Sequence, residues 1–157
     1  MSKKWITYAL VVLIPVVAYF ANVEWQTRRG LQALEATRLD FQPLDQALLR
    51  ARAKKKPVLA DFSAIWCPTC RAMHATVFTD PAVKAAIESG YVLSRIDYES
   101  PQAPAFMTKY AVTGFPTLLV LDADGKLLRR VPVTLDPAQF AISLQRGTEH
   151  PTSQTTP

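Results

Sequence analysis

The stretch VLADFSAIWCPTC, residues 58–70, decides the fold, because it joins an apolar segment to the only two cysteines of the 157-residue chain. Cys67 and Cys70 are three positions apart, so on the first turn of a helix both thiols lie on one face. Pro68 suits the first position of such a helix, since the N–H that proline lacks would be unpaired there. Cys67 then falls at the N-cap, where free N–H groups and the helix dipole favour a thiolate. The spacing predicts a reactive dithiol that forms a reversible disulfide.

Other uses of a CxxC pair fit this sequence less well. A c-type haem attachment needs a histidine directly after the second cysteine, where this chain has Arg71. A zinc site needs four ligands, and beyond the two cysteines only His74 and His150 remain. His150 lies in a tail of Thr, Ser, Pro and Gln, so no metal site is expected. A purely structural disulfide across so short a loop would constrain the unfolded chain little.

The N-terminal segment differs from the rest of the chain in composition. Two lysines precede an uncharged, apolar stretch over residues 5–21, and Trp5 and Trp25 stand 20 positions apart. On a helix this separation is about 30 Å, which matches the hydrocarbon core of a bilayer with one indole at each interface. Residues 1–25 are therefore expected to be a transmembrane signal anchor rather than a cleaved signal peptide, for which the cleavage site is poor.

The charge distribution predicts a location. The basic flank at the N-terminus would stay in the cytoplasm and the remainder would be exported, which in a bacterium means the periplasm, where disulfide chemistry is active. The expected protein is thus single-pass in the inner membrane with its domain in the periplasm. Nucleic-acid binding is not expected of an exported, tethered chain despite a net charge of +5. The basic run at residues 50–56 is expected to be a solvated helix end, with contact to anionic lipid headgroups as the alternative.

The remaining sequence predicts a linker, one domain and a tail. Residues 26–40 are polar and helix-compatible and are expected to be a linker or stalk, followed by a domain at 41–147 and a disordered tail at 148–157. The predicted helices are 44–54, 68–78, 81–87, 101–110 and 137–144, and the predicted strands are 58–62, 91–97, 117–121 and 126–133. This order predicts an α/β fold, a central mixed β-sheet flanked by helices on both faces.

With this order of elements, the chain resembles the thioredoxin superfamily over about residues 41–146. WCPTC at residues 66–70 is followed by VTGFPT at residues 112–117, and that pairing is specific. Within the superfamily the sequence is most similar to the C-terminal periplasmic domain of the thiol–disulfide interchange protein DsbD and to single-domain relatives of that domain. The resemblance implies a thioredoxin-like fold, no cofactor beyond the two thiols, and a separate DsbD-like electron donor in the membrane.

The resemblance also implies roles for individual residues. Cys67 would be the exposed attacking thiolate and Cys70 the shielded resolving thiol. Pro116 matches the cis-proline of the family, and Phe115 beside it would offer backbone groups to an extended substrate strand. The other positions implied to contact substrate are Trp66, Pro68 and Thr69.

Asp61 interrupts the apolar strand at 58–62, which predicts a carboxyl group inside the domain or in a cleft. In the family, the residue six positions before the first cysteine exchanges protons with the resolving thiol, and Asp61 holds that position. A solvated Asp61 at a strand edge is the alternative. Thioredoxin often has a lysine four positions before the acid that ends the next strand; here that position is Leu93, so Asp61 is expected to lack this charged neighbour.

Taken together, the sequence predicts a membrane-anchored periplasmic thiol–disulfide oxidoreductase that reduces the disulfides of exported proteins. The two residues between the cysteines leave the direction open, so a thiol oxidase or isomerase of the same fold is an alternative. A second alternative is a metallochaperone that holds Cu(I) between the two thiolates, with His74 as a further ligand, because soft ligands select Cu(I). Asp61 and Pro116 favour redox exchange, since a metal carrier needs neither.

Overall fold

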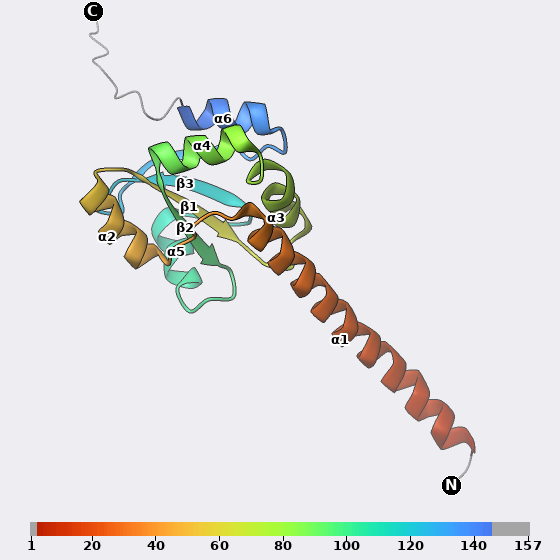
Figure 1. Ribbon diagram of the computed structural model, residues 1–157. Helices are drawn as coiled ribbons and strands as arrows, with labels where there is room; N and C mark the ends of the chain where they lie inside the picture. Colours follow the sequence, from red (N-terminus) through yellow and green to blue (C-terminus); the bar gives the residue numbers. More distant parts are fainter. Residues whose placement is uncertain (1–2, 146–157) are drawn as a thin grey trace, which may run out of the picture.

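The computed structural model describes residues 3–145 and contains a four-stranded sheet between two layers of helices, from which one long helix projects (Figure 1). The strands are β1 (Val58–Ser63), β2 (Val92–Asp97), β3 (Thr117–Leu121) and β4 (Leu127–Val131). The helices are α1 (Lys3–Thr37), α2 (Leu44–Lys54), α3 (Pro68–Ala72), α4 (Pro81–Gly90), α5 (Ala103–Tyr110) and α6 (Pro137–Gln145), with a π-helical turn, η1 (Met73–Val77), directly after α3. The predicted α/β fold is confirmed, and the predicted tail lies outside the described residues.

The sheet is mixed, as the sequence predicts, with strand order β2-β1-β3-β4. β1 pairs in parallel with β2 and antiparallel with β3, and β3 pairs antiparallel with β4. β1 therefore lies inside the sheet, and all six of its residues are buried. A strand covered on both faces needs a nearly continuous apolar sequence, which makes Asp61 within it exceptional.

Alternation along the strands divides the core into two layers. Val58, Ala60 and Phe62 of β1 pack in the layer that contains α2 and α5. Leu59 packs in the other layer, with side chains from η1, α4 and α6. Asp61 shares the face of Leu59, so the strand period directs its carboxyl group toward η1 and away from solvent.

The helix that follows the dithiol is less regular than the sequence predicts. It begins at Pro68, with Cys67 as its N-cap residue. After Ala72 the turn widens, and the N–H of Phe78 bonds to the carbonyl of Met73 at 3.0 Å, the longer step of a π-helix. This wider turn carries His74, which is buried.

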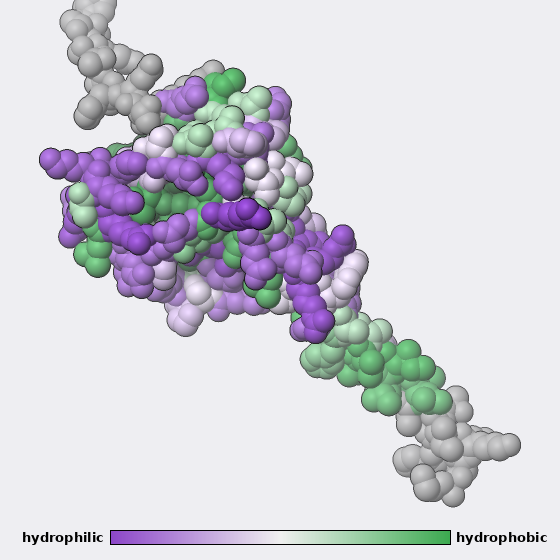
Figure 2. All heavy atoms as spheres, in the orientation of Figure 1, coloured by the Kyte–Doolittle hydropathy of each residue, from purple (hydrophilic) through white to green (hydrophobic). Residues whose placement is uncertain are grey.

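α1 is one continuous helix that runs through the predicted anchor and most of the predicted linker. It ends at Thr37. The stretch from Leu10 onward is long and apolar enough to cross a membrane, by length and composition alone, a test that a signal sequence also passes. Figure 2 shows hydrophobic residues along the part of α1 that projects outward, and mostly hydrophilic residues over the domain.

The last third of α1 packs on the domain and does not stand free as a stalk. Gly30 and Thr37 are buried, and Gln26, Ala33 and Leu34 are half-buried. These positions recur every three or four residues, so they form one stripe along the helix. The sequence pattern concealed the stripe because most of its members are small or polar, and such residues carry no hydrophobic period.

The basic run at residues 50–56 finds its partners within the domain. Arg50 pairs with Asp40 at 2.6 Å, and Arg52 pairs with Asp124 at 3.0 Å. The ammonium group of Lys56 donates to the backbone oxygen of Glu88 at 3.0 Å. These contacts support the interpretation as a solvated helix end, on an element that covers the sheet face opposite η1.

Candidate active site

The two thiols meet at the start of α3. Cys67 ends the loop that follows β1, and its Sγ accepts a hydrogen bond from the backbone N–H of Cys70 at 3.2 Å. Both cysteines are free thiols in this structure. Because an N–H donor and the positive end of a helix point at Cys67 Sγ, negative charge on that sulfur is favoured over negative charge on its partner.

Both thiols are more covered than the resemblance implied for an exposed nucleophile. Cys67 is 5% exposed and Cys70 is 1% exposed, and the pair packs with Ala64 and Phe115. Burial raises the pKa of the Cys70 thiol, and its hydrogen bond with Cys67 raises the pKa further. Cys70 is therefore held in the protonated form and needs a base before it can attack a sulfur.

Asp61 is a buried carboxyl group that interacts electrostatically with Cys70. It is 1% exposed, which rules out the solvated alternative. Its Oδ2 lies 2.8 Å from Nε2 of His74 and accepts a hydrogen bond from Oγ of Ser63 at 3.2 Å, whereas its Oδ1 has no hydrogen-bond partner. The negative charge of Asp61 is also one of the causes that raise the pKa of Cys70, so the carboxyl group and the resolving thiol interact.

His74 is the site residue whose role sequence reasoning missed. The sequence suggests His74 only as a metal ligand beside the cysteines, but in the structure its Nε2 is engaged by Asp61, and its ring packs against Phe41 and Phe78 with centroids 5.9 and 5.5 Å away. Within residues 3–145, no group of three or more His, Cys, Asp or Glu side chains is placed to hold a metal ion. The available signal was its position four residues after Cys70, one turn further along the predicted helix.

Asp61 lacks the lysine that thioredoxin often has at the position of Leu93, but a different positive charge lies near it. Arg95 is its register partner on β2, and the Arg95 guanidinium donates to Ser63 Oγ at 3.1 Å and to Asp97 at 2.6 Å. A single hydroxyl group thus separates the Arg95 cation from Asp61. The positive charge comes from the middle of β2 instead of from the position of Leu93.

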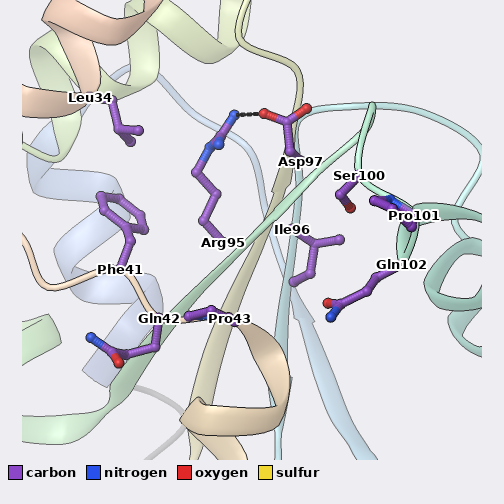
Figure 3. Close-up of a pocket in the computed structure, with 10 residues that line it drawn as sticks. All are labelled: Leu34, Phe41, Gln42, Pro43, Arg95, Ile96, Asp97, Ser100, Pro101 and Gln102. Carbon is purple, nitrogen blue, oxygen red and sulfur yellow. Dashed lines mark hydrogen bonds and ion pairs between the residues drawn. The ribbon is translucent and has the colours of Figure 1, made fainter.

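A cavity of about 500 Å³ lies beyond this arginine, between Phe41 and the start of α5 (Figure 3). Figure 3 shows Arg95 reaching across the cavity wall to Asp97, with Phe41 on one side and Gln102 on the other. Neither cysteine lines this cavity, so it lies apart from the reactive surface. Its hydrogen-bonded connection to Asp61 runs through Arg95 and Ser63.

Aromatic side chains surround the dithiol on its outer side. The rings of Trp66 and Phe115 meet edge to face at 5.3 Å, and Tyr98 lies 5.1 Å from Phe115 and 6.3 Å from Trp66. The indole N–H of Trp66 donates to Glu99 at 3.1 Å, and Trp66 remains 39% exposed. The rings therefore form a partly exposed platform next to Cys67.

The remaining predicted contact residues belong to the same surface. The Phe115–Pro116 peptide bond is cis, and Pro116 immediately precedes β3. Pro68 and Thr69 are exposed between the two cysteines. The fold thus brings together residues 66–70 and 115–116, which are some 45 positions apart in the sequence.

The fold, the capped dithiol and the buried carboxyl group beside it define a thioredoxin-like protein and support thiol–disulfide oxidoreductase activity. The chain belongs to this family, because the model of a thioredoxin-like domain matches residues 44–148.

Known relatives agree with this assignment. The chain is 39% identical over 155 residues to the thiol:disulfide interchange protein DsbD of Klebsiella pneumoniae, an alignment that covers 92% of this chain and 25% of the relative. The chain therefore spans about a quarter of the length of that relative. A thioredoxin from Thermus thermophilus is 26% identical with a TM-score of 0.61, covering 69% of this chain and 85% of its own. The oxidised C-terminal domain of DsbD from Neisseria meningitidis is 26% identical with a TM-score of 0.57, covering 66% of this chain and 92% of its own.

Proposed function

We propose that the protein is a membrane-anchored thiol–disulfide oxidoreductase of the periplasm that reduces the disulfides of exported proteins. The observation that carries this proposal is the asymmetry of the dithiol. Cys67 Sγ accepts the N–H of Cys70, while the Cys70 thiol is buried and has a raised pKa. This asymmetry suits Cys67 as the attacking thiolate and Cys70 as the thiol that reacts in the second step. Similarity to DsbD supports the reducing direction.

In the first step, the Cys67 thiolate attacks one sulfur of a substrate disulfide. The substrate S–S bond breaks, the leaving sulfur takes up a proton, and a mixed disulfide joins Cys67 to the substrate. We assign to Phe115 and Pro116 the binding of an extended substrate segment by backbone pairing. Trp66, Pro68 and Thr69 would complete the contact surface.

In the second step, Asp61 accepts the proton of Cys70. The resulting Cys70 thiolate attacks Cys67 Sγ, the mixed disulfide breaks, and the second substrate sulfur leaves and is protonated. Two electrons have then passed to the substrate, and the protein holds a Cys67–Cys70 disulfide. We propose that a DsbD-like membrane protein returns two electrons to it through the same pair of exchanges.

Location is the second part of the proposal and depends on α1. Apolar side chains between Leu10 and Phe20 are exposed all around the helix, an arrangement that suits lipid and not water. The basic flank that precedes them favours an exported domain.

Trapping tests the mechanism. In a Cys70→Ser variant the mixed disulfide cannot be resolved, so covalent complexes through Cys67 should accumulate with exported proteins and should vanish on reduction. Cys67→Ser is the matched control and should trap none. Recovery of no complex from the exported fraction would count against dithiol exchange.

Equilibration in glutathione buffers tests the direction. A reductase should have a midpoint nearer to the value of thioredoxin, about −270 mV, than to that of the oxidant DsbA, about −120 mV. A midpoint near the DsbA value would contradict the reducing direction and indicate a thiol oxidase.

A further inference from the structure

One contact of the active-site loop plays no part in the exchange chemistry: the backbone of α1 lies directly against it. A Cβ atom added to Gly30 would lie 2.0 Å from the backbone oxygen of Ile65 and 2.8 Å from its side chain. Ile65 precedes Cys67 by two residues. Only a residue without a side chain permits this approach, so α1 is seated on the loop that carries the nucleophile.

A second contact joins α1 to the residue that follows the dithiol. The guanidinium of Arg71, the residue after Cys70, donates to the backbone oxygen of Gln26 at 3.4 Å and also to the side-chain oxygen of Gln26. At the end of the helix, Thr37 is buried, and Leu34 lines the cavity beside Phe41 and Arg95. The joint between helix and domain thus extends over residues 26–37, about three turns.

The apolar stretch of α1 ends close to this joint. With Trp25 at the outer interface, Gln26 and Gly30 follow it by one and five residues, which is about 2 and 8 Å along a helix. The interfacial layer of a bilayer is about 5–8 Å deep on each side of its hydrocarbon core. With α1 in a membrane and rigidly seated, the loop that bears Cys67 would therefore stand at the level of the headgroups.

A cavity opens between the helix and the reactive surface at this height. It measures about 480 Å³ and is lined by residues of α1 and of the platform beside the dithiol: Tyr19, Asn22, Val23, Gln26, Trp66 and Glu99. Tyr19 lies within the apolar stretch, whereas Trp66 directly precedes Cys67. An occupant that touches both must lie partly in the membrane interface.

We propose, on the basis of the membrane-anchored function above, that α1 holds the dithiol at a fixed height and thereby selects an integral membrane protein as redox partner. The partner's reactive sulfur lies at the membrane surface, and its adjoining segment enters the cavity between Tyr19 and Trp66. A rigid joint raises the effective concentration of Cys67 at one distance from the membrane surface. A flexible tether would instead distribute Cys67 over a wide range of distances. Electrons pass between this partner and the Cys67–Cys70 pair by the two thiol–disulfide exchanges of the proposed function.

Full-length protein in vesicles of phosphatidylethanolamine and phosphatidylglycerol tests this selection. The probes are two synthetic transmembrane peptides whose cysteine carries a fluorescent thiol in disulfide linkage. The cysteine stands at the bilayer boundary in one and beyond a ten-residue proline spacer, about 30 Å long, in the other. Reduced wild-type protein should release the fluorophore at least ten times faster from the boundary peptide. Equal rates would overturn the proposal.

Two variants isolate the joint. Gly30→Leu should displace α1 from Ile65 and lower the boundary rate at least five-fold while leaving the rate with a soluble peptide disulfide unchanged. Leu31→Ala, at the exposed neighbouring position, is the matched control and should behave as wild type. A flexible insertion of four Gly and Ser residues between Trp25 and Gln26 keeps the packing intact and should also abolish the height preference.

The outcomes separate this proposal from the function on which it rests. If both the Gly30→Leu variant and the insertion variant still reduce the boundary peptide at least ten times faster than the spacer peptide, the role of the joint is overturned. If the wild type fails to reduce even the soluble peptide disulfide, the oxidoreductase function itself fails, and with it the partner proposal.

Discussion

His74 Nε2 lies 2.8 Å from Oδ2 of Asp61, and the two side chains are only 4% and 1% exposed. The histidine comes from the π-helical turn η1 and the aspartate from the internal strand β1. Since Ser63 binds the same oxygen, Oδ1 is the oxygen of Asp61 left to take a proton. His74 therefore acts as a positioning residue for the proposed base.

Replacement of His74 tests this pairing. His74→Leu leaves the buried Asp61 with one hydrogen-bond partner fewer, so the free energy of unfolding should fall by about 1–3 kcal/mol in urea titrations. The resolving step should slow, and its pH profile should change; the measurement is the rate at which a substrate thiol is released from the mixed disulfide. His74→Gln can donate to the same oxygen and should restore much of both. Equal behaviour of the two variants would argue for a packing role only.

Asp61→Asn tests the base itself. Removal of a proton acceptor should slow resolution by about 100-fold, the lower range for general base catalysis, while the redox midpoint changes little. Stopped-flow measurement of the resolving step and glutathione equilibration provide the two readouts. Asp124→Asn is a suitable control, because that carboxylate is 80% exposed in a distant turn. Wild-type rates in Asp61→Asn would remove Asp61 from the mechanism.

The raised pKa of Cys70 predicts selective alkylation. At pH 7 iodoacetamide should modify Cys67 alone, and Cys70 should react only after unfolding, as mass spectrometry of the separated peptides can determine. Modification of both thiols at equal rates in the folded protein is the opposite outcome.

The same shift in pKa predicts how stability varies with pH. Above about 8.5, the ordinary pKa of a cysteine, the unfolded chain loses the Cys70 proton while the folded protein retains it. The unfolded state then binds fewer protons, so the free energy of unfolding should decrease as the pH rises. Cys70→Ser should reduce this slope, and urea titrations at pH 7 to 10 measure it. An unchanged slope would mean that Cys70 does not cause it.

Membrane attachment has a direct test. Full-length protein should stay with the membrane fraction in high salt and in alkaline carbonate, because burial of the apolar part of α1 in lipid does not depend on charge. Detergent should release it. Recovery of the protein in the soluble pool, shortened at its N-terminus, would mean that the segment is cleaved as a signal peptide.

Local chemistry explains why much of this protein was predictable from its residues. Pro68 after Cys67 predicts a helix start, and Asp80 before Pro81 predicts another; the structure has both, with Asp80 accepting the N–H groups of Ala82 and Val83. The apolar run at 117–121 predicts β3 with the same bounds. Each of these features depends on neighbouring residues, so the sequence alone contains them.

Contacts between distant residues were not predictable in this way. Nothing in the sequence relates His74 to Asp61, because their meeting depends on the alternation of β1 and on the widened turn η1 acting together. The contact of α1 with the active-site loop was not predictable for another reason. It depends on Gly30, whose missing side chain makes room for Ile65 but leaves no apolar pattern.

The sequence by itself determined the dithiol, its helix cap and the order of strands and helices, since short-range sterics and hydrogen bonding act between adjacent residues. Only the tertiary structure decided which histidine holds the buried acid and which helix lies against the reactive loop. Those relationships follow from close packing between elements. The volume and shape of each side chain determine which elements can approach, and a pattern of polar and apolar residues does not reveal this.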